Sequence, residues 1–268
     1  MRQTIEAQNL AKCGWNYTSA TSYVTMSFWV KSSVAQNFYG HIETGDGTSY
    51  NFPFETGSLT ADTWKKVVIK IPGNSNLTFD NNNAAGLLLE LVAFRGTGFT
   101  ASMTLNQWAA YNSNSRVPDM TSTWYTTNDA TLEFTGIQLE VGSQATAFEH
   151  RSYGEELSLC QRYYFKYLEG ITKEIGAAWY YTSSHASFFF QFPVPMRAVP
   201  TGTDTTGTDY YIIYRNGGSD ALNSVTFENG STEQYSAYNN SEASGTAGQC
   251  GLIRSSNSSS KIEFSAEL

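Results

Sequence analysis

The chain has 268 residues, enough for one large or two modest β domains with hydrophobic cores, and we expect two. Charged residues make up 15% of the chain and aromatic residues another 15%, a balance that favours short strands and polar turns over long helices. The formal net charge is -8 and no apolar run approaches the length of a bilayer-spanning helix, so we expect no nucleic-acid binding and no membrane insertion.

The first half of the chain predicts a series of antiparallel strands. Residues 24–33 alternate apolar and polar side chains, which indicates a strand with one buried face. Residues 65–71 alternate in the same way and stop at a Pro-Gly pair, whereas residues 84–94 are apolar on both parities, as in a central strand covered on both faces. Residues 1–12 have only weak helical or extended character and are predicted to lead in from something upstream.

A strand, a charged turn and a helix are predicted to follow one another between residues 131 and 168. The apolar parity of the strand switches across Thr135 and Gly136, which indicates a β-bulge. Ser152 and Glu155 have the spacing of a capping box at the start of a helix. Two apolar strips then recur at helical spacing, so the helix should pack against two surfaces. The strips consist of Leu157, Leu159, Cys160, Tyr163, Tyr164 and Tyr167.

The second half predicts further short strands. One strand, a turn at residues 183–184 and a second strand should form a hairpin in which Phe188 and Phe190 face one side and Phe189 the other. More strands are predicted at residues 209–215, 223–229, 248–254 and 260–268. Polar surface loops are predicted at residues 201–208 and 229–248.

These elements predict an all-β fold of antiparallel sandwiches with one short helix. The expected domains are residues 1–150, a linking helix at residues 151–169, and a C-terminal β domain, or tip, at residues 170–268.

The segment GIQLEVGSQATAFEHRSYGEELSLCQRYYFKY, residues 136–167, resembles a signature of bacteriophage tail-fibre and related virion proteins. The successive strand patterns SFWVKSS, TWKKVVIKIPG, LLLELVAF and GIQLEVG are similar to the jelly-roll domains of carbohydrate-binding modules that occur in phage fibres.

The resemblance implies a receptor-binding protein of the virion, made in the bacterial host cytoplasm and joined to an upstream virion protein. It also implies a homotrimer, with the apolar strips of the predicted helix as the interface between subunits. The partner outside the virion would be a host cell-surface glycan or another envelope component. Two other functions stay open, a structural virion component that binds only phage proteins and a free carbohydrate-binding module.

The sequence offers few groups that could perform catalysis together. His41, His150 and His185 lie in unrelated contexts, and the chain lacks HExxH, GxSxG and Walker motifs. We therefore expect no enzymatic activity.

The sequence predicts no cofactor and no catalytic metal. The segments with Glu43 and Asp46, and with Asp80 and residues 81–83, could offer oxygen ligands to a structural calcium ion, although neither matches an EF-hand. The alternative is that these are Asx turns, which bond to their own backbone. The three cysteines lack CxxC pairing and are expected to be buried thiols, with a disulfide between Cys13 and Cys250 as the alternative.

Exposed aromatic rings in polar loops are the candidates for ligand binding, because sugar rings stack on them. The candidates are Tyr235 and Tyr238 in the C-terminal domain, and Trp108, Tyr111, Trp124 and Tyr125 in the first domain. The alternative for each ring is a place in a core or a subunit interface. Trp29 lies on the polar parity of its strand, where it could cover the sheet, contact a neighbouring subunit or bind ligand.

Overall fold

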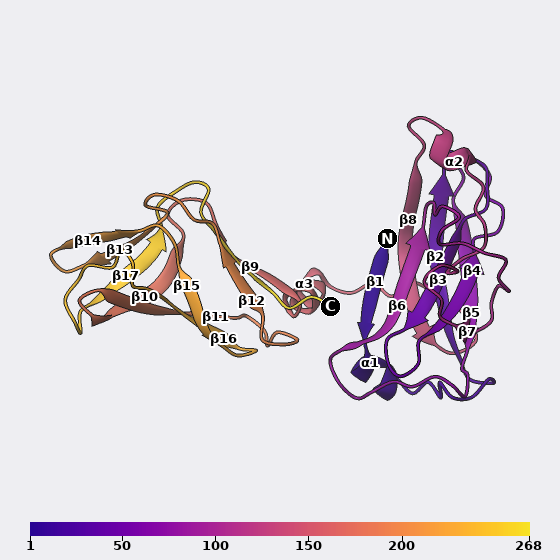
Figure 1. The fold of residues 1–268 in the computed structure, drawn as a ribbon, viewed down its shortest axis with the longest axis horizontal. Coiled ribbons are helices and arrows are strands. Elements are labelled where there is room, and N and C mark those ends of the chain that lie inside the picture. The colour runs from indigo at the N-terminus through magenta and orange to yellow at the C-terminus, as the bar shows by residue number, and fades with distance from the viewer. The chain divides into compact units, whose positions relative to one another are not determined.

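The computed structural model describes all 268 residues and is mostly β, with several antiparallel sheets and few helices. This confirms the predicted fold class at that level. The chain divides into two compact units, Met1–His150 and Arg151–Glu267, each with its own hydrophobic core (Figure 1). None of the helices is both long and apolar enough to cross a bilayer.

The first unit consists of two antiparallel sheets that share one core. Its elements in chain order are β1 (Arg2–Glu6), α1 (Ala7–Lys12), β2 (Tyr23–Ser32), β3 (Tyr39–Thr44), β4 (Tyr50–Glu55), β5 (Lys65–Pro72), β6 (Ala85–Val92), β7 (Ala109–Ala110), α2 (Thr123–Thr126) and β8 (Leu132–Val141). The strand order is β1-β6-β3-β4-β7 in one sheet and β5-β2-β8 in the other. Phe28 of β2 and Phe54 of β4 are both fully buried and meet with their ring centroids 6.5 Å apart. The predicted strands correspond to β2, β5, β6 and β8 and are confirmed.

Two predictions for the first unit need correction. Residues 2–12 are not a weakly structured lead-in, because β1 pairs with β6 along its length and Ala7 and Leu10 of α1 are buried. β2 is buried on more than one face, since Thr25 and Ser27 on its polar parity are buried as well as its apolar side chains. The hairpin of β3 and β4 was not predicted.

The β-bulge predicted in β8 is confirmed. Trp29 pairs with Thr135 while Ser27 pairs with Gln138, so β8 holds one extra residue there. Gly136 supplies the left-handed conformation, with φ of 58°. A glycine at this position is the usual first residue of a bulge of this kind.

The segment that follows β8 folds back onto its own strand through side chains of the signature segment. Thr146 donates from its amide and its hydroxyl to the Glu140 carboxylate, at 2.9 and 2.7 Å. Gln138 accepts from the Glu149 amide at 2.8 Å, and Thr25 donates to the Gly142 carbonyl at 2.7 Å. The polar residues of the segment therefore make local hydrogen bonds that fix residues 142–149.

The second unit again pairs a large sheet with a small one. Its elements are α3 (Tyr153–Gln161), β9 (Tyr164–Glu169), β10 (Glu174–Thr182), β11 (His185–Gln191), β12 (Thr201–Asp204), β13 (Tyr211–Arg215), β14 (Gly218–Leu222), β15 (Thr226–Gly230), β16 (Gln234–Asn239), β17 (Cys250–Ser255) and β18 (Lys261–Ser265). The seven-stranded sheet has the order β14-β13-β17-β10-β11-β16-β15, and the three-stranded sheet has the order β12-β18-β9. Phe190 of β11 and Phe264 of β18 are fully buried between them, with centroids 5.2 Å apart.

The helix was predicted at the right start and with the wrong end. Ser152 and Glu155 form the capping box, which is confirmed. The helix ends at Gln161, however, and Tyr164 and Tyr167 lie on β9, which pairs with β18. Residues 151–169 are therefore not a separate linking helix, since they form a short helix and a strand of the second unit.

The predicted hairpin of the second unit is confirmed as β10 and β11, with Phe188, Phe190 and Phe192 buried and Phe189 exposed. The predicted polar loops are partly wrong, because residues 201–204 form β12 and residues 234–239 form β16. The cysteines are also not buried, since all three are exposed and none is in a disulfide.

Candidate functional site

One face of the seven-stranded sheet in the second unit carries several exposed aromatic side chains, with Ser187 and Ser236 lying among them. The opposite face is covered by the core and the three-stranded sheet. Antiparallel sheets with one solvated face normally alternate apolar inside with polar outside. The aromatic face, as we name it, consists of Trp179, Tyr181, His185, Phe189, Tyr214, Tyr238 and Leu252. A contiguous exposed surface of this kind commonly marks a binding site.

The strand register places these side chains together. Trp179 of β10 pairs with Ser187 of β11, which in turn pairs with Tyr238 of β16. On the other side of β10, Leu252 of β17 pairs with Tyr214 of β13. The face thus runs across five neighbouring strands, from β13 to β16, about 19 Å at ~4.8 Å per strand.

Contacts between the rings hold the aromatic face in place. Trp179 and Phe189 have centroids 5.1 Å apart and planes tilted by 37°. His185 stacks on Tyr238 at 4.8 Å and 16°, with the Tyr181 ring 5.8 Å from His185. These side chains are half-buried or exposed, and Tyr181 and Phe189 expose 73% and 51% of their surface. The rings are therefore positioned before any ligand arrives.

The aromatic face carries little charge. Arg254 of β17 lies at its β13 end, where its guanidinium is 4.4 Å from the Tyr214 ring centroid and donates to the Tyr214 hydroxyl at 2.7 Å. The Arg254 guanidinium is therefore already bound by the hydroxyl and the ring of Tyr214. The chemistry that the face offers is therefore ring stacking and apolar contact.

The predicted ligand residues of the second unit separate onto two faces. Tyr235 and Tyr238 both lie on β16 and not in a loop. Tyr235 packs into the core against Phe227 and Phe264, each with centroids 5.7 Å away. Tyr238 points to the opposite side and belongs to the aromatic face.

Of the four ring candidates in the first unit, the two tryptophans pack against the core. The Trp108 indole donates to the Pro72 carbonyl at 2.7 Å, and the Trp124 indole donates to the Thr131 carbonyl at 3.0 Å. Tyr111 lies beside Arg116, whose guanidinium is 5.6 Å from its ring centroid. Tyr125 is exposed and stacks flat on Phe94, with centroids 4.5 Å apart. The four rings do not form one surface.

The residues of the predicted trimer interface also lie in different environments. Leu157, Leu159 and Cys160 are exposed on α3, and no residue of this helix is buried. Tyr164 on β9 bonds to the Glu263 carboxylate, and Tyr167 donates to the Ile175 carbonyl at 2.9 Å from within the core. Tyr163 follows the helix, with the Arg162 guanidinium 5.9 Å from its ring centroid. Of the six residues, only Leu157, Leu159 and Cys160 are exposed on the helix itself.

The largest concentration of titratable side chains in the first unit is a closed network. His41 is buried, with its two ring nitrogens 2.8 Å from Asn51 Oδ1 and from Glu90 Oε2. Arg95 also donates to Glu90. The hydrogen bond from His41, more than the charge of Arg95, lowers the pKa of Glu90 to about 2. These side chains form their hydrogen bonds with one another, so the network fits a structural role.

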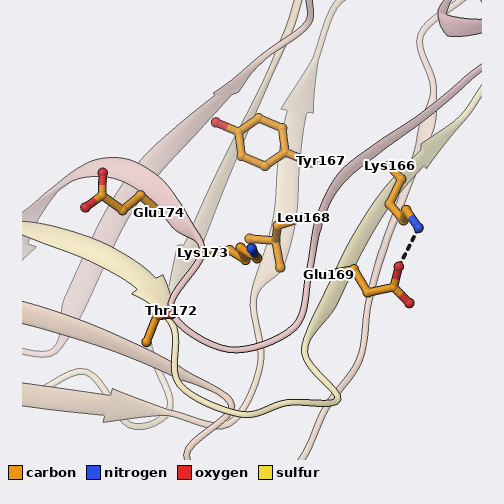
Figure 2. A pocket seen from close by; sticks show the side chains of 7 residues that line it. All are labelled: Lys166, Tyr167, Leu168, Glu169, Thr172, Lys173 and Glu174. Atoms are coloured by element: carbon orange, nitrogen blue, oxygen red, sulfur yellow. Dashed lines mark hydrogen bonds and ion pairs between the residues drawn. The ribbon is translucent and has the colours of Figure 1, made fainter.

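A depression of about 520 Å³ lies where β9 turns into β10 (Figure 2). Its lining is Lys166, Tyr167, Leu168, Glu169, Thr172, Lys173 and Glu174. Lys166 pairs with Glu169, and this hydrogen bond raises the pKa of the lysine and lowers that of the glutamate (Figure 2). Its charges are of both signs, so it offers no clear preference for one ligand.

Of the predicted calcium ligands, Asn82 forms an Asx turn, because its Oδ1 accepts a hydrogen bond from the Ala84 amide at 2.9 Å. Asp46 instead accepts a long-range hydrogen bond from the Asp80 amide at 3.0 Å. No group of three or more His, Cys, Asp or Glu side chains is arranged to hold a metal ion.

Most of the aromatic face was not found from the sequence. The alternation of residues 188–192 placed Phe189 opposite the core, and the run Trp179-Tyr180-Tyr181 is a further signal of a strand with aromatic residues on both faces. The pairing that brings β13, β17 and β16 beside this hairpin is a long-range property. Comparisons of the chain with known protein families, with curated proteins and with solved structures gave no match.

Proposed function

We propose that this protein is the receptor-binding, distal part of a bacteriophage tail fibre, which adheres to a glycan on the host surface and performs no catalysis. The observation that carries the proposal is the aromatic face of the second unit. The resemblance of residues 136–167 to virion proteins supports the class of protein. In this proposal the first unit is a jelly roll akin to a carbohydrate-binding module, and the chain assembles as a homotrimer.

The shape of the aromatic face suits an extended ligand more than a small molecule. Enzyme and cofactor sites are concave and bury most of the ligand, whereas this surface is an open sheet face. A glycan chain could lay the apolar faces of several sugar rings on Trp179, Phe189 and Tyr181. Because the rings already contact one another, binding would cost little side-chain entropy.

Self-association is supported by the exposure of α3. A helix of 9 residues is too short to be stable in water by itself, and this one buries none of its residues against the rest of the chain. Leu157 and Leu159 expose 40% and 46% of their surface. Packing against copies of the same helix would bury these side chains, and three copies would raise the avidity of weak glycan contacts.

The adhesion experiment uses the fluorescently labelled full chain on a panel of bacterial cells. We expect Tyr181→Ala with Phe189→Ala to reduce the bound fluorescence by about tenfold, the effect of losing about 1.4 kcal/mol of binding energy. Phe99→Ala is the matched control, because Phe99 is an exposed phenylalanine of the first unit. Equal binding by the double variant and the control would contradict the proposal. A glycan array then separates sugar receptors from protein receptors.

A structural virion component is the second candidate. The apolar Leu252 and Phe189 expose 37% and 51% of their surface on the aromatic face and would suit a protein partner as well as a sugar. A chain that binds no cell of the panel, yet stays attached to purified virions through the aromatic face, would favour this function.

Residues 230–247 fall within the polar loop predicted at residues 229–248, but they are not suitable for deletion as a test of receptor binding. They include β16, which pairs with both β11 and β15. Their removal would break the large sheet, so point substitutions on the exposed face are the sharper test.

A further inference from the structure

A second unusual surface lies on the first unit, on the face of the β5-β2-β8 sheet that points away from the core. The register aligns Trp29 of β2 with Lys66 of β5, and Thr25 with Lys70. Between the two lysines, Val68 points the same way, and its inward neighbours Val67 and Ile69 are buried. The tryptophan–lysine face, as we name it, consists of Trp29, Trp64, Lys66, Val68 and Lys70.

The bulge in β8 keeps Trp29 on the surface. A Cβ atom at Gly136 would lie 3.5 Å from Cδ1 of Trp29 and 3.8 Å from Cδ2 of Phe148, so the indole and the phenyl ring lie beside the bare backbone of this glycine. Trp29 and Phe148 still expose 42% and 46% of their surface. The indole is therefore supported on one side and open on the other.

The carboxylates on this face are each held by neighbouring groups. Glu133 pairs with Lys31 at 2.8 Å, and the Lys31 ammonium also lies 5.1 Å from the centroid of the Trp64 ring. Glu140 is held by hydrogen bonds from the Thr146 amide and hydroxyl, which lower its pKa.

Lys66 and Lys70 are exposed, and neither forms an ion pair at 4.0 Å or less. The charge of Lys66 acts on the Glu140 carboxylate from a longer distance and helps to lower its pKa. The two lysines lie four residues apart on one strand, about 13 Å at ~3.3 Å per residue. Two exposed lysines beside exposed tryptophans contrast with the formal net charge of -8 for the whole chain.

We propose that the tryptophan–lysine face binds an acidic polysaccharide, a chain of sugars that carries carboxylates. The indoles of Trp29 and Trp64 would stack on sugar rings, and Lys66 and Lys70 would pair with carboxylates along the chain. The spacing of the two lysines suits an oligosaccharide and not a single sugar. The site goes beyond the proposed function, because it lies in the other unit and does not depend on the aromatic face.

A nucleic acid is the less suitable polyanion. Its affinity comes mainly from neutralising many phosphates, typically about 6–10 in a duplex complex. The face offers two exposed lysines, which are too few to neutralise the phosphates of such a complex. A polyuronate has one carboxylate per sugar and an apolar ring face for stacking, which matches the two indoles and two lysines of this face.

The experiment is affinity electrophoresis of the full chain in gels that contain polygalacturonate, with neutral dextran as the reference gel. We expect retardation by polygalacturonate at low salt that disappears near 1 M NaCl, where the Debye length is about 3 Å. Lys66→Gln with Lys70→Gln should weaken the retardation about tenfold, as should Trp29→Ala. Thermal unfolding checks that each variant is folded.

The matched controls are Lys166→Gln with Lys173→Gln, the same change of charge in the second unit, and Phe99→Ala for the aromatic substitution. Retardation should be unchanged in both. Absence of retardation of the original chain, equal losses in the control variants, or tighter binding of single-stranded DNA than of polygalacturonate would each overturn the proposal. Loss of cell binding in the Tyr181 and Phe189 variant leaves this readout untouched, so the two proposals fail separately.

Discussion

Phe190 and Phe189 are adjacent on β11 and point to opposite faces of the sheet, so the same substitution should have opposite consequences at the two positions. Phe190 is fully buried and its ring contacts Tyr167, Phe188 and Phe264, with centroids 4.9, 5.8 and 5.2 Å away. Phe190→Ala removes a phenyl ring from a packed core and should cost about 3–5 kcal/mol. Phe189→Ala removes an exposed ring and should change the free energy of unfolding by less than about 0.5 kcal/mol.

Scanning calorimetry of the full chain measures this difference. For a unit of this size, 1 kcal/mol shifts the midpoint by about 3–5 °C, so Phe190→Ala should lower the transition of the second unit by roughly 10–20 °C. Phe190→Leu keeps most of the buried volume and should give a smaller shift in the same direction. A drop of 10 °C or more for Phe189→Ala would refute the assignment of the aromatic face as open to solvent.

Three further predictions concern the first unit and α3. The hydrogen bond from His41 lowers the pKa of Glu90 from 4.5 to about 2. The ionised carboxylate therefore stabilises the first unit fully above pH 4.5, and this stabilisation of about 3 kcal/mol is lost as the pH falls toward 2. Glu90→Gln should flatten the dependence of the unfolding midpoint on pH between those values. Gly136→Ala should destabilise the first unit by about 1–2 kcal/mol, because the φ of Gly136 is 58°. Gly154→Ala within α3 is the control and should not destabilise the chain. Urea unfolding of the two variants measures the difference. Ser152→Ala removes the cap of α3 and should destabilise the helix by about 1 kcal/mol. The amides of residues 153–161 should then exchange hydrogen faster than in the original chain. Equal exchange rates in the variant and the original chain would contradict the role of Ser152 as a cap.

Strands with a strong local pattern were predictable from the sequence. In β2 and β5 a buried apolar side chain recurs at every second position, and in β8 the parity switch at Thr135 and Gly136 located the bulge. The hairpin of β3 and β4 was missed because glycine and a proline break the pattern there. Pro53 nevertheless lies within β4, opposite His41.

The misassignment of β9 has a simple physical reason. Residues spaced by three or four positions, such as Leu157, Cys160, Tyr164 and Tyr167, fit a helix, but aromatic residues on alternate positions fit a strand equally well. Tyr163, Tyr164 and Phe165 favour the strand by intrinsic preference. The pairing of Phe165 with Phe264 decides between the two, and it depends on a segment about a hundred residues away.

The candidate site was predictable only in part for the same reason. Tyr238 was predicted as a ligand-binding ring in a polar loop, whereas it lies half-buried on β16 and stacks on His185 of another strand. Tyr235 was selected with it and is a core residue, because a residue on a strand and the third residue after it point to opposite faces. Local patterns show which side chains point outward, whereas the strand order determines which of them form one surface.

The position of β18 in the second unit has a consequence for the order of events during synthesis. β18 lies between β12 and β9, and its Phe264 closes the core against Phe190. Partners so distant in sequence give a high contact order, which slows folding. The second unit therefore cannot complete its core until residues 261–265 have left the ribosome, whereas the strands of the first unit pair among themselves and can fold earlier. Nascent chains should accordingly expose the aromatic side chains of β10 and β11 from the time these strands emerge until β18 emerges, a period in which chaperones protect such surfaces.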